Sequence, residues 1–352
     1  AFGGSSARGI SFLPVGGSGR FGSGQGVPSV AGHSRNISAL DFSPFHDALL
    51  VTAAEDGSVK IWELGEGKAS VSETASAWSA SQKRIQALAF NPVADGVLAT
   101  AAADGVVKVW DVNAEAELCA APSIESQPQS LAWDYAGATL VVTAKDKTVR
   151  VYDLRASADG PVASGPGHDG IKATRVTWMG DSSRFVTTGF DKYRSREVRV
   201  YDMASSLDAP ISKTKMDSSS GILMPLYDAD TKLLFLGGKG DVALRFYEDD
   251  GGKLLEAGSV GSREQISGLA LAPKRVLNVW DCEVARVLKL TAAGAVVPVS
   301  YKVPRKSYAK FHPELYPETR GTTPGATAPE WASGANGSVA LVSLQPEGER
   351  PT

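Results

Sequence analysis

A short segment recurs five times along this 352-residue chain, and no other feature of the sequence restricts the possible folds so strongly. Residues 51–64 (VTAAEDGSVKIWEL) and 99–112 (ATAAADGVVKVWDV) agree at nearly every position, and residues 142–154 (VTAKDKTVRVYDL) form a third copy. Two more diverged copies end at Tyr201 and Tyr247. The aromatic residues that end successive copies lie 42 to 49 residues apart, a period that indicates an array of repeated structural units.

Each copy predicts a β-hairpin whose second strand has one exposed face. Small residues lead into Asp-Gly or a similar turn, which supplies the positive φ that a tight hairpin requires, and an alternating strand follows. A further apolar strand precedes each of the first four copies, at Ile37–Phe42, Ile85–Phe90, 129–133 and 173–178. Because one small sheet cannot bury its faces alone, the repeats predict an all-β ring of blades, a WD40-type β-propeller.

Carboxylates recur at the turn of every copy, and they could be read as a metal site or an acid–base set. Their regular position favours a structural role instead, as hydrogen-bond acceptors within the turn. These residues are Asp56, Asp104, Asp146, Asp191 and Asp241. His33 and His168 each follow a glycine, as in the Gly-His pair of WD40 blades, and we interpret both as structural.

The repeat weakens towards both ends of the chain. Strands are still expected at 265–271, 283–290, 296–303 and 339–344, but without the Asp-Gly turn or the Trp-Asp ending. Residues 10–15 predict one strand, and the glycine- and serine-rich residues 16–26 predict a flexible loop. We therefore expect a partial N-terminal strand and loop (1–26), propeller blades (27–303) and a C-terminal extension with a possible ring-closing strand (304–352). Five blades are clear, one is degenerate, and a seventh would be shared between the two ends.

Composition excludes several classes of protein. The hydrophobic fraction of 43% and the charged fraction of 21% are typical of a globular chain. A net charge of −3 argues against a dedicated nucleic-acid binder. Cys119 and Cys282 are too few for a disulfide framework or a cysteine zinc site, which fits a reducing compartment. With no long apolar run and no signal-peptide pattern at the start, we expect a cytosolic location.

The sequence contains no recognisable catalytic or cofactor-binding motif. Residues 17–22 match G-x-G-x-x-G, but the residues after them cannot open the helix that the dinucleotide fingerprint needs. His46 and His312 are the remaining histidines, and neither lies beside a recognisable nucleophile. We therefore expect no enzyme, no cofactor and no metal, and the alternative left open is an active site assembled from several blades.

The later copies carry motifs more specific than a general WD40 repeat. Residues 187–190 (TTGF) lead into 193–202 (YRSREVRVYD), and residues 217–231 (DSSSGILMPLYDADT) are followed by 236–241 (LGGKGD) and 245–248 (RFYE). Further motifs stand at 272–276 (APKRV), 282–286 (CEVAR), 303–307 (VPRKS), 314–317 (ELYP) and 330–331 (EW). In these motifs the chain resembles the coronins, a family of actin-binding propeller proteins, over roughly residues 27–345.

This resemblance implies a seven-bladed ring with a C-terminal extension folded beneath it. It also implies binding along actin filaments, a role in filament turnover, and a place in the cytoplasm at the actin cytoskeleton and the cell cortex. Coronins usually carry further residues before the equivalent of Ile10, and they end in a coiled coil that contacts the actin-branching complex. Nothing after Leu344 shows a heptad, so contact with that complex would need a coiled coil beyond this sequence.

A net-negative propeller needs concentrated lysine and arginine to meet an acidic filament. One alternative is that these side chains are ordinary solvated strand edges and hairpin tips, or that arginines among them pair inside the blades with the repeated aspartates. Another is that the chain is a general WD40 scaffold for another complex or an acidic membrane surface. The actin-binding candidates are Lys145, Lys147 and Arg150; Lys192, Arg194, Arg196 and Arg199; Lys274 and Arg275; and Lys302, Arg305 and Lys306.

Overall fold

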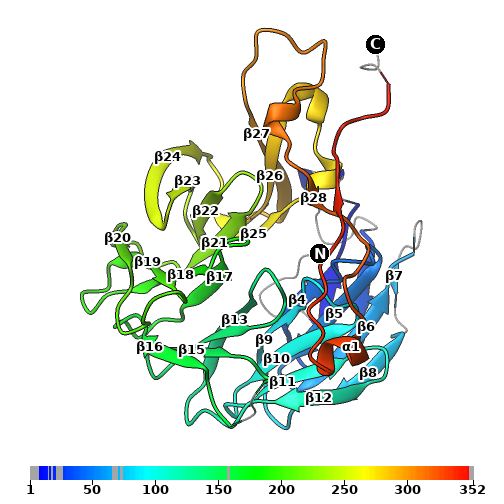
Figure 1. The fold of residues 1–352 in the computed structure, drawn as a ribbon, viewed down its shortest axis with the longest axis vertical. Helices are drawn as coiled ribbons and strands as arrows, with labels where there is room; N and C mark the ends of the chain where they lie inside the picture. Colours follow the sequence, from blue (N-terminus) through cyan, green and yellow to red (C-terminus); the bar gives the residue numbers. More distant parts are fainter. Residues whose placement is uncertain are drawn as a thin grey trace.

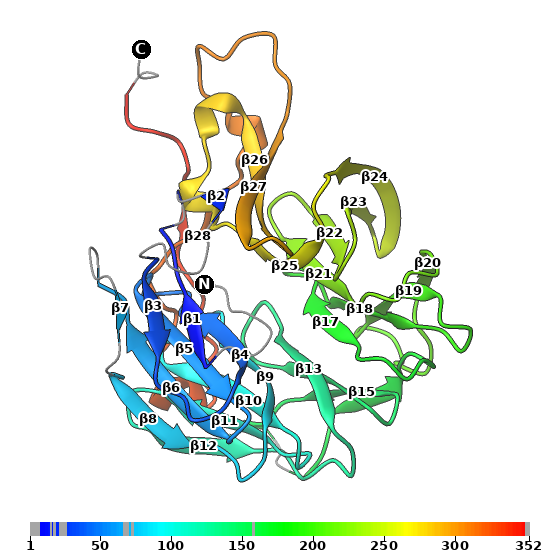
Figure 2. The ribbon, with the colours of Figure 1, turned by 180° about the vertical axis from the view of Figure 1, so that it is seen from behind.

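The computed structural model describes residues 8–14, 16, 19–20, 27–65, 70–71, 74–156 and 159–348. Six four-stranded sheets follow one another in chain order around an open centre, which confirms the all-β WD40 propeller (Figures 1 and 2). Blade 1 comprises β4 (Ile37–Phe42), β5 (Leu49–Ala54), β6 (Ser58–Glu63) and β8 (Ser76–Ser79). Blade 2 comprises β9 (Ile85–Phe90), β10 (Val97–Ala102), β11 (Val107–Asp111) and β12 (Ala116–Ala120). Blade 3 comprises β13 (Pro128–Trp133), β14 (Leu140–Ala144), β15 (Thr148–Tyr152) and β16 (Ala163–Pro166).

The second half of the ring follows the same order of strands. Blade 4 comprises β17 (Arg175–Trp178), β18 (Arg184–Phe190), β19 (Arg196–Asp202) and β20 (Ser212–Lys215). Blade 5 comprises β21 (Leu223–Asp228), β22 (Leu233–Gly238), β23 (Ala243–Asp250) and β24 (Lys253–Gly261). Blade 6 comprises β25 (Ile266–Leu271), β26 (Glu283–Thr291) and β27 (Ala295–Lys302), and the short β2 (Gly19–Arg20) is its edge strand. The short helices η1 (Lys274–Val276) and η2 (Val279–Asp281) lie between β25 and β26.

The core is divided into clusters that lie between neighbouring blades. All residues of β10 and β14 are buried, since these strands are covered on both faces. Between blades 3 and 4, Val141 and Val151 pack with Phe185 and Tyr201. Comparable clusters join blades 1 and 2, blades 4 and 5, and blades 5 and 6. Each blade is therefore stabilised by its neighbours, as the repeat pattern predicts.

The expected seven blades are not what the described residues form. Six blades have four strands, whereas β1 (Gly9–Ser11), β3 (Ser29–Ala31) and β7 (Ser70–Val71) make a smaller three-stranded sheet. In this sheet β3 pairs antiparallel with β1 and parallel with β7, so it lacks the meander of a blade. The count of seven was wrong because the N-terminal strands either form this small sheet or, as β2, extend blade 6.

The C-terminal segment contains η3 (Pro313–Leu315), β28 (Thr319–Arg320), α1 (Ala328–Ala332) and β29 (Leu341–Val342). The strand expected at 339–344 does not close the ring, because β29 pairs with β28. The indole of Trp331 packs edge-on against Trp133 at 5.7 Å and donates a hydrogen bond of 2.7 Å to the Gly137 carbonyl. Arg155 lies over the same indole and bonds to the Ala335 carbonyl.

Two sequence interpretations fall largely outside the described residues. Of the expected loop at 16–26 and the G-x-G-x-x-G motif within it, only Gly16, Gly19 and Arg20 are described, the last two as β2. The structure likewise describes the N-terminal part (1–26) only from residue 8, with gaps. Among the described residues, no helix is long and apolar enough to cross a membrane.

Candidate protein-binding surface

Turns that join the second and third strands of every blade lie at one end of the propeller, because successive strands of an antiparallel meander reverse direction. We call this end, where the loops that enter each blade also lie, the turn face. The opposite face is the end where the first strand of a blade connects to the second and the third to the fourth. The turns are residues 55–57, 103–105, 145–147, 191–195, 239–242 and 292–294.

The recurrent aspartates hold the geometry of these turns. Asp56, Asp104 and Asp146 each accept a hydrogen bond of 3.0 to 3.1 Å from the backbone N–H two residues further on. Asp191 accepts two such bonds, from the N–H groups of Tyr193 and Ser195. This is the geometry of an Asx turn, in which a carboxylate replaces a backbone acceptor.

The same carboxylates also fasten the loop that enters each blade. Ser81 donates a hydrogen bond of 2.6 Å to Asp104, and Ser219 donates one of 3.3 Å to Asp241. In blade 3 the direction is reversed, because the backbone N–H of Asp146 donates to the Ser126 hydroxyl at 2.8 Å. Neighbouring loops of the turn face are therefore joined to one another.

The two glycine-preceded histidines are buried within blades. The Nε2 atom of His33 lies 2.7 Å from the Thr52 hydroxyl, which also accepts a hydrogen bond of 2.8 Å from the Trp62 indole. Burial lowers the pKa of His33 to about 4, so its ring is neutral near pH 7. His168 lies between the Thr187 hydroxyl and a Glu197 carboxylate oxygen, both at 2.9 Å, and burial lowers its pKa as well.

Two of the basic candidates are buried in ion pairs. Arg196 is 3% exposed and bonds to Asp217 at 2.6 Å and to Asp241 at 2.8 Å. Arg199 is 6% exposed and bonds to Glu197 at 2.7 Å and Asp169 at 3.0 Å. These guanidinium groups connect elements inside the protein, and the exposed surface does not include them.

Glu197 is the centre of the charged group around Arg199. Burial disfavours its ionised form, but hydrogen bonds from His168 and Lys213 and the charge of Arg199 lower its pKa to about 2. The carboxylate therefore stays ionised, and it neutralises the cations that surround it.

Five other candidates are half-exposed or exposed and already have a carboxylate partner. They pair at 2.5 to 3.4 Å, except that Lys274 is closer still to Asp228. The pairs are Arg150 with Asp146, Lys274 with Asp228, Arg275 with Asp47, Lys302 with Asp281, and Arg305 with Glu314. Ion pairs near solvent contribute little to stability, but they reduce the charge that a partner meets.

The remaining candidates are exposed, and none forms an ion pair with the residues that the structure describes. Lys145 and Lys147 lie in the turn of blade 3, and Lys192 and Arg194 lie in the turn of blade 4. The structure thus brings these two groups together on the turn face of neighbouring blades. Lys306 is also exposed, but it follows β27 at the opposite face, together with Lys302 and Arg305. Lys274 and Arg275 lie at that face too.

Two exposed apolar residues beside these cations were missed by the sequence reasoning. Among the described large apolar side chains, Ile171 (81% exposed) and Tyr193 (74% exposed) are the most accessible. Ile171 lies in the loop before β17, and Tyr193 lies in the turn of blade 4. The only available signal was an apolar residue inside a loop or turn, where polar residues are usual.

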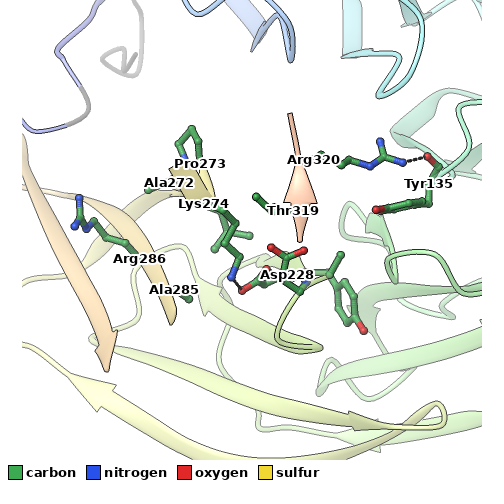
Figure 3. Close-up of a pocket in the computed structure, with 13 residues that line it drawn as sticks. Tyr135, Asp228, Ala272, Pro273, Lys274, Ala285, Arg286, Thr319 and Arg320 are labelled. Atoms are coloured by element: carbon green, nitrogen blue, oxygen red, sulfur yellow. Dashed lines mark hydrogen bonds and ion pairs between the residues drawn. The ribbon is translucent and has the colours of Figure 1, made fainter. Parts of the chain in front are cut away.

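A cavity of about 290 Å³ lies on the opposite face, where β28 crosses blades 3, 5 and 6 (Figure 3). Its cations already have acceptors within the protein. Lys274 bonds to Asp228 and, at 2.6 Å, to the Val284 carbonyl, and Arg286 bonds to Glu283. Arg320 stacks 3.5 Å above the Tyr135 ring and bonds to the Pro92 carbonyl. No serine, cysteine or histidine lines this cavity, and the described residues contain no metal-binding cluster.

Comparisons with known proteins agree with the propeller fold and identify its repeat as the WD40 type. Patterns described as "WD domain, G-beta repeat" match residues 24–63, 73–111 and 125–153, and a type of WD40 repeat matches residues 296–339. The crystal structure of a WD40 domain from Toxoplasma gondii coronin superposes with a TM-score of 0.88 at 31% identity, covering 96% of this chain and 87% of the other. The protein is therefore a WD40 β-propeller.

Sequence relatives identify the family. Coronin-A of Dictyostelium discoideum is 40% identical over 90% of this chain and 71% of its own length. Coronin-like protein crn1 of Schizosaccharomyces pombe is 34% identical over 89% of the chain, and the coronin-like protein of Saccharomyces cerevisiae is 32% identical over 88%. The chain belongs to the coronin family. It spans about half the length of the two yeast relatives (52% and 48%).

Proposed function

We propose that this chain is an actin-filament-binding adaptor of the coronin type. The observation that carries the proposal is a group of exposed cations on the turn face of blades 3 and 4, in a chain whose net charge is −3. These cations form no ion pair with the residues that the structure describes. An acidic filament would be attracted to such a local excess of positive charge. The family resemblance supplies actin as the partner.

The same proposal includes how the propeller acts, where it works and which parts of the chain bind. The propeller acts by presenting a surface rather than by catalysis, and it works in the cytoplasm at the actin cytoskeleton and the cell cortex. Residues 27–303 form the binding unit, and residues 304–352 act as an extension that stabilises it from the opposite face. Support for the last point comes from the contacts of Trp331 and Arg320 with blades 2 and 3.

Co-sedimentation with actin filaments across a salt series tests the proposal. We expect saturable pelleting at low salt that weakens as salt rises, because exposed charge contacts are screened. A folded chain that stays in the supernatant at low salt would refute filament binding by this region. Pelleting with anionic vesicles, but not with filaments, would favour an acidic membrane surface instead.

Charge reversal distinguishes the two faces. We expect Lys145→Glu with Lys192→Glu to weaken filament binding about tenfold or more, since both groups are exposed and lack carboxylate partners. The matched control is Arg305→Glu with Lys306→Glu on the opposite face. If the control variant loses affinity and the first variant does not, the filament meets the opposite face.

A further inference from the structure

One residue in the turn of five blades has the left-handed backbone conformation. Its N–H donates a hydrogen bond of 3.0 to 3.1 Å to the carbonyl three residues earlier, so the five positions are equivalent. Three of them are glycine: Gly57 (φ 79°), Gly105 (φ 86°) and Gly294 (φ 76°). In blades 3 and 4 the position is instead occupied by Lys147 (φ 64°) and Arg194 (φ 68°).

A side chain at this position strains the backbone. The Cβ atom of an L-residue crowds the following carbonyl in the left-handed conformation, whereas glycine avoids the clash. The propeller therefore loses stability at Lys147 and Arg194 that it does not lose at the equivalent glycines. Glycine would avoid this backbone strain at both positions. A strained residue where glycine would fit indicates that its side chain has a role of its own.

Nearby acids offset only part of the charge around these two residues. Three neighbouring carboxylates of the turn face already pair with other cations: Asp146 with Arg150 at 2.5 Å, Asp169 with Arg199 at 3.0 Å, and Asp191 with Lys215 at 3.3 Å. Glu125, in the loop before β13, forms no ion pair with the described residues. The four turn cations, Lys145, Lys147, Lys192 and Arg194, thus remain as a local positive excess.

Apolar side chains stand within this charged group. Tyr193 lies between Lys192 and Arg194 in the turn, with the Lys192 ammonium 5.1 Å from its ring centroid. Ile171 is in the adjacent loop, where the N–H of Gly170 donates to the Phe190 carbonyl at 2.7 Å. Exposed tyrosine beside arginine is typical of residues that carry binding energy in protein interfaces.

Arg196 anchors the turn and the loop that carry these exposed residues. Its guanidinium bonds to Asp217 in the loop before blade 5, and to Asp241 in the turn of blade 5. Lys172, next to Ile171, donates a hydrogen bond of 2.5 Å to the Ser220 carbonyl of that same loop. The backbone segments that carry the exposed side chains are therefore fixed before a partner binds, so that less conformational entropy is lost on binding.

We propose that the turns of blades 3 and 4 form the main filament contact, in which Tyr193 and Ile171 enter an apolar recess of the actin surface and the four turn cations meet surrounding acidic residues. This inference rests on the proposed function and specifies its surface. It assigns to Lys147 and Arg194 a binding role that explains their strained backbone.

Glycine substitution separates binding from stability. In the double variant Lys147→Gly, Arg194→Gly we expect the thermal midpoint to rise by roughly 2 °C, because the strain is released. We expect its affinity for filaments to fall about tenfold in co-sedimentation, because two contacts are lost. A variant that becomes more stable and binds more weakly is not expected from a purely structural residue.

Lys232→Gly provides the matched control. Lys232 is a lysine with a left-handed backbone (φ 54°), but it lies in the turn between β21 and β22 on the opposite face. We expect its substitution to raise the thermal midpoint and to leave filament affinity unchanged. Ile171→Ser with Tyr193→Ser should leave the midpoint unchanged and weaken binding about tenfold, with the salt dependence retained.

The outcomes are distinguishable. If the wild-type chain pellets with filaments and both turn-face variants pellet equally well, the assignment of this surface is wrong while filament binding stands. If the Lys147→Gly, Arg194→Gly variant is less stable than the wild type, the strain argument is wrong. If the folded wild-type chain does not bind filaments at all, the proposed function fails and this inference fails with it.

Discussion

At the scale of single residues, burial decides which charges of this propeller reach a partner. Arg196 and Arg194 are two positions apart, yet the first is enclosed by two aspartates and the second is exposed. The reason is their position: Arg194 lies in the exposed turn with a left-handed backbone, whereas Arg196 begins β19, whose residues from Arg196 to Tyr201 are all buried. Buried polar groups such as His33 and Glu197 are each fully engaged with neighbours, because an unpaired group there would cost folding free energy.

His33 makes stability depend on pH. Its pKa is about 4 in the folded protein and about 6.5 when unfolded, so the unfolded chain binds more protons between these values. Its contribution is complete above pH 6.5 and is lost as the pH falls towards 4. In urea unfolding, we expect the wild type to lose about 1 to 2 kcal/mol more than His33→Gln between pH 7.5 and 5. Equal losses in the two proteins would contradict this assignment.

At the scale of elements, the hairpin turn is the unit that joins one blade to the next. Its aspartate shapes the turn and also fastens the incoming loop, as Asp104 does with Ser81. Between blades 4 and 5 a larger connection is added to the bond between Ser219 and Asp241. There Arg196, at the start of β19, bonds to both Asp217 and Asp241.

Removing Arg196 should loosen the contact between blades 4 and 5. We expect Arg196→Ala to lower the free energy of unfolding by about 2 to 4 kcal/mol, because Asp241 loses its cation and Asp217 keeps only Arg245. Lys192→Ala, four residues away and exposed, should change it by no more than about 0.5 kcal/mol. Chemical denaturation of both variants measures the difference, and similar values would show that Arg196 is dispensable.

At the scale of the whole molecule, the C-terminal segment connects parts of the chain that are far apart in sequence. Trp331 reaches Trp133 and Gly137, and the Ala326 carbonyl accepts a hydrogen bond of 2.9 Å from Asp95. The six blades have no strand from this segment, which instead contacts blades 2 and 3, and we propose that it braces them. A Thr327 capping box starts the helix that carries Trp331.

Truncating this indole tests the brace. We expect Trp331→Ala to lower the free energy of unfolding by about 3 to 5 kcal/mol, since it leaves a large cavity and removes one of the two side-chain hydrogen bonds to the Gly137 carbonyl. Faster limited proteolysis within residues 321–340 should accompany the loss. A variant with the stability and the cleavage pattern of the wild type would show that the segment does not support the blades.

Local pattern was sufficient to predict the blades themselves. The alternation and the Asp-Gly turns are properties of a few consecutive residues, so the strands at Ile37–Phe42 and Ile85–Phe90 were predicted at their observed bounds. The all-β propeller followed, because repeated two-sided sheets must cover one another. The coronin motifs then identified the family, although they lie in the less regular blades.

Contacts between distant residues decided the rest. The sequence allowed arginines to pair inside the blades with the repeated aspartates, but nothing near Arg196 and Arg199 shows that these two guanidinium groups do so, and both were candidates for the binding surface. The pairing of β29 with β28, and of β2 with β27, likewise depends on which edges meet in space, and with it the count of six blades. The sequence by itself determined the repeating unit and the fold class, because these depend on local periodicity. Only the tertiary structure decided which charges stay exposed and how the ends of the chain are used, because these depend on long-range packing.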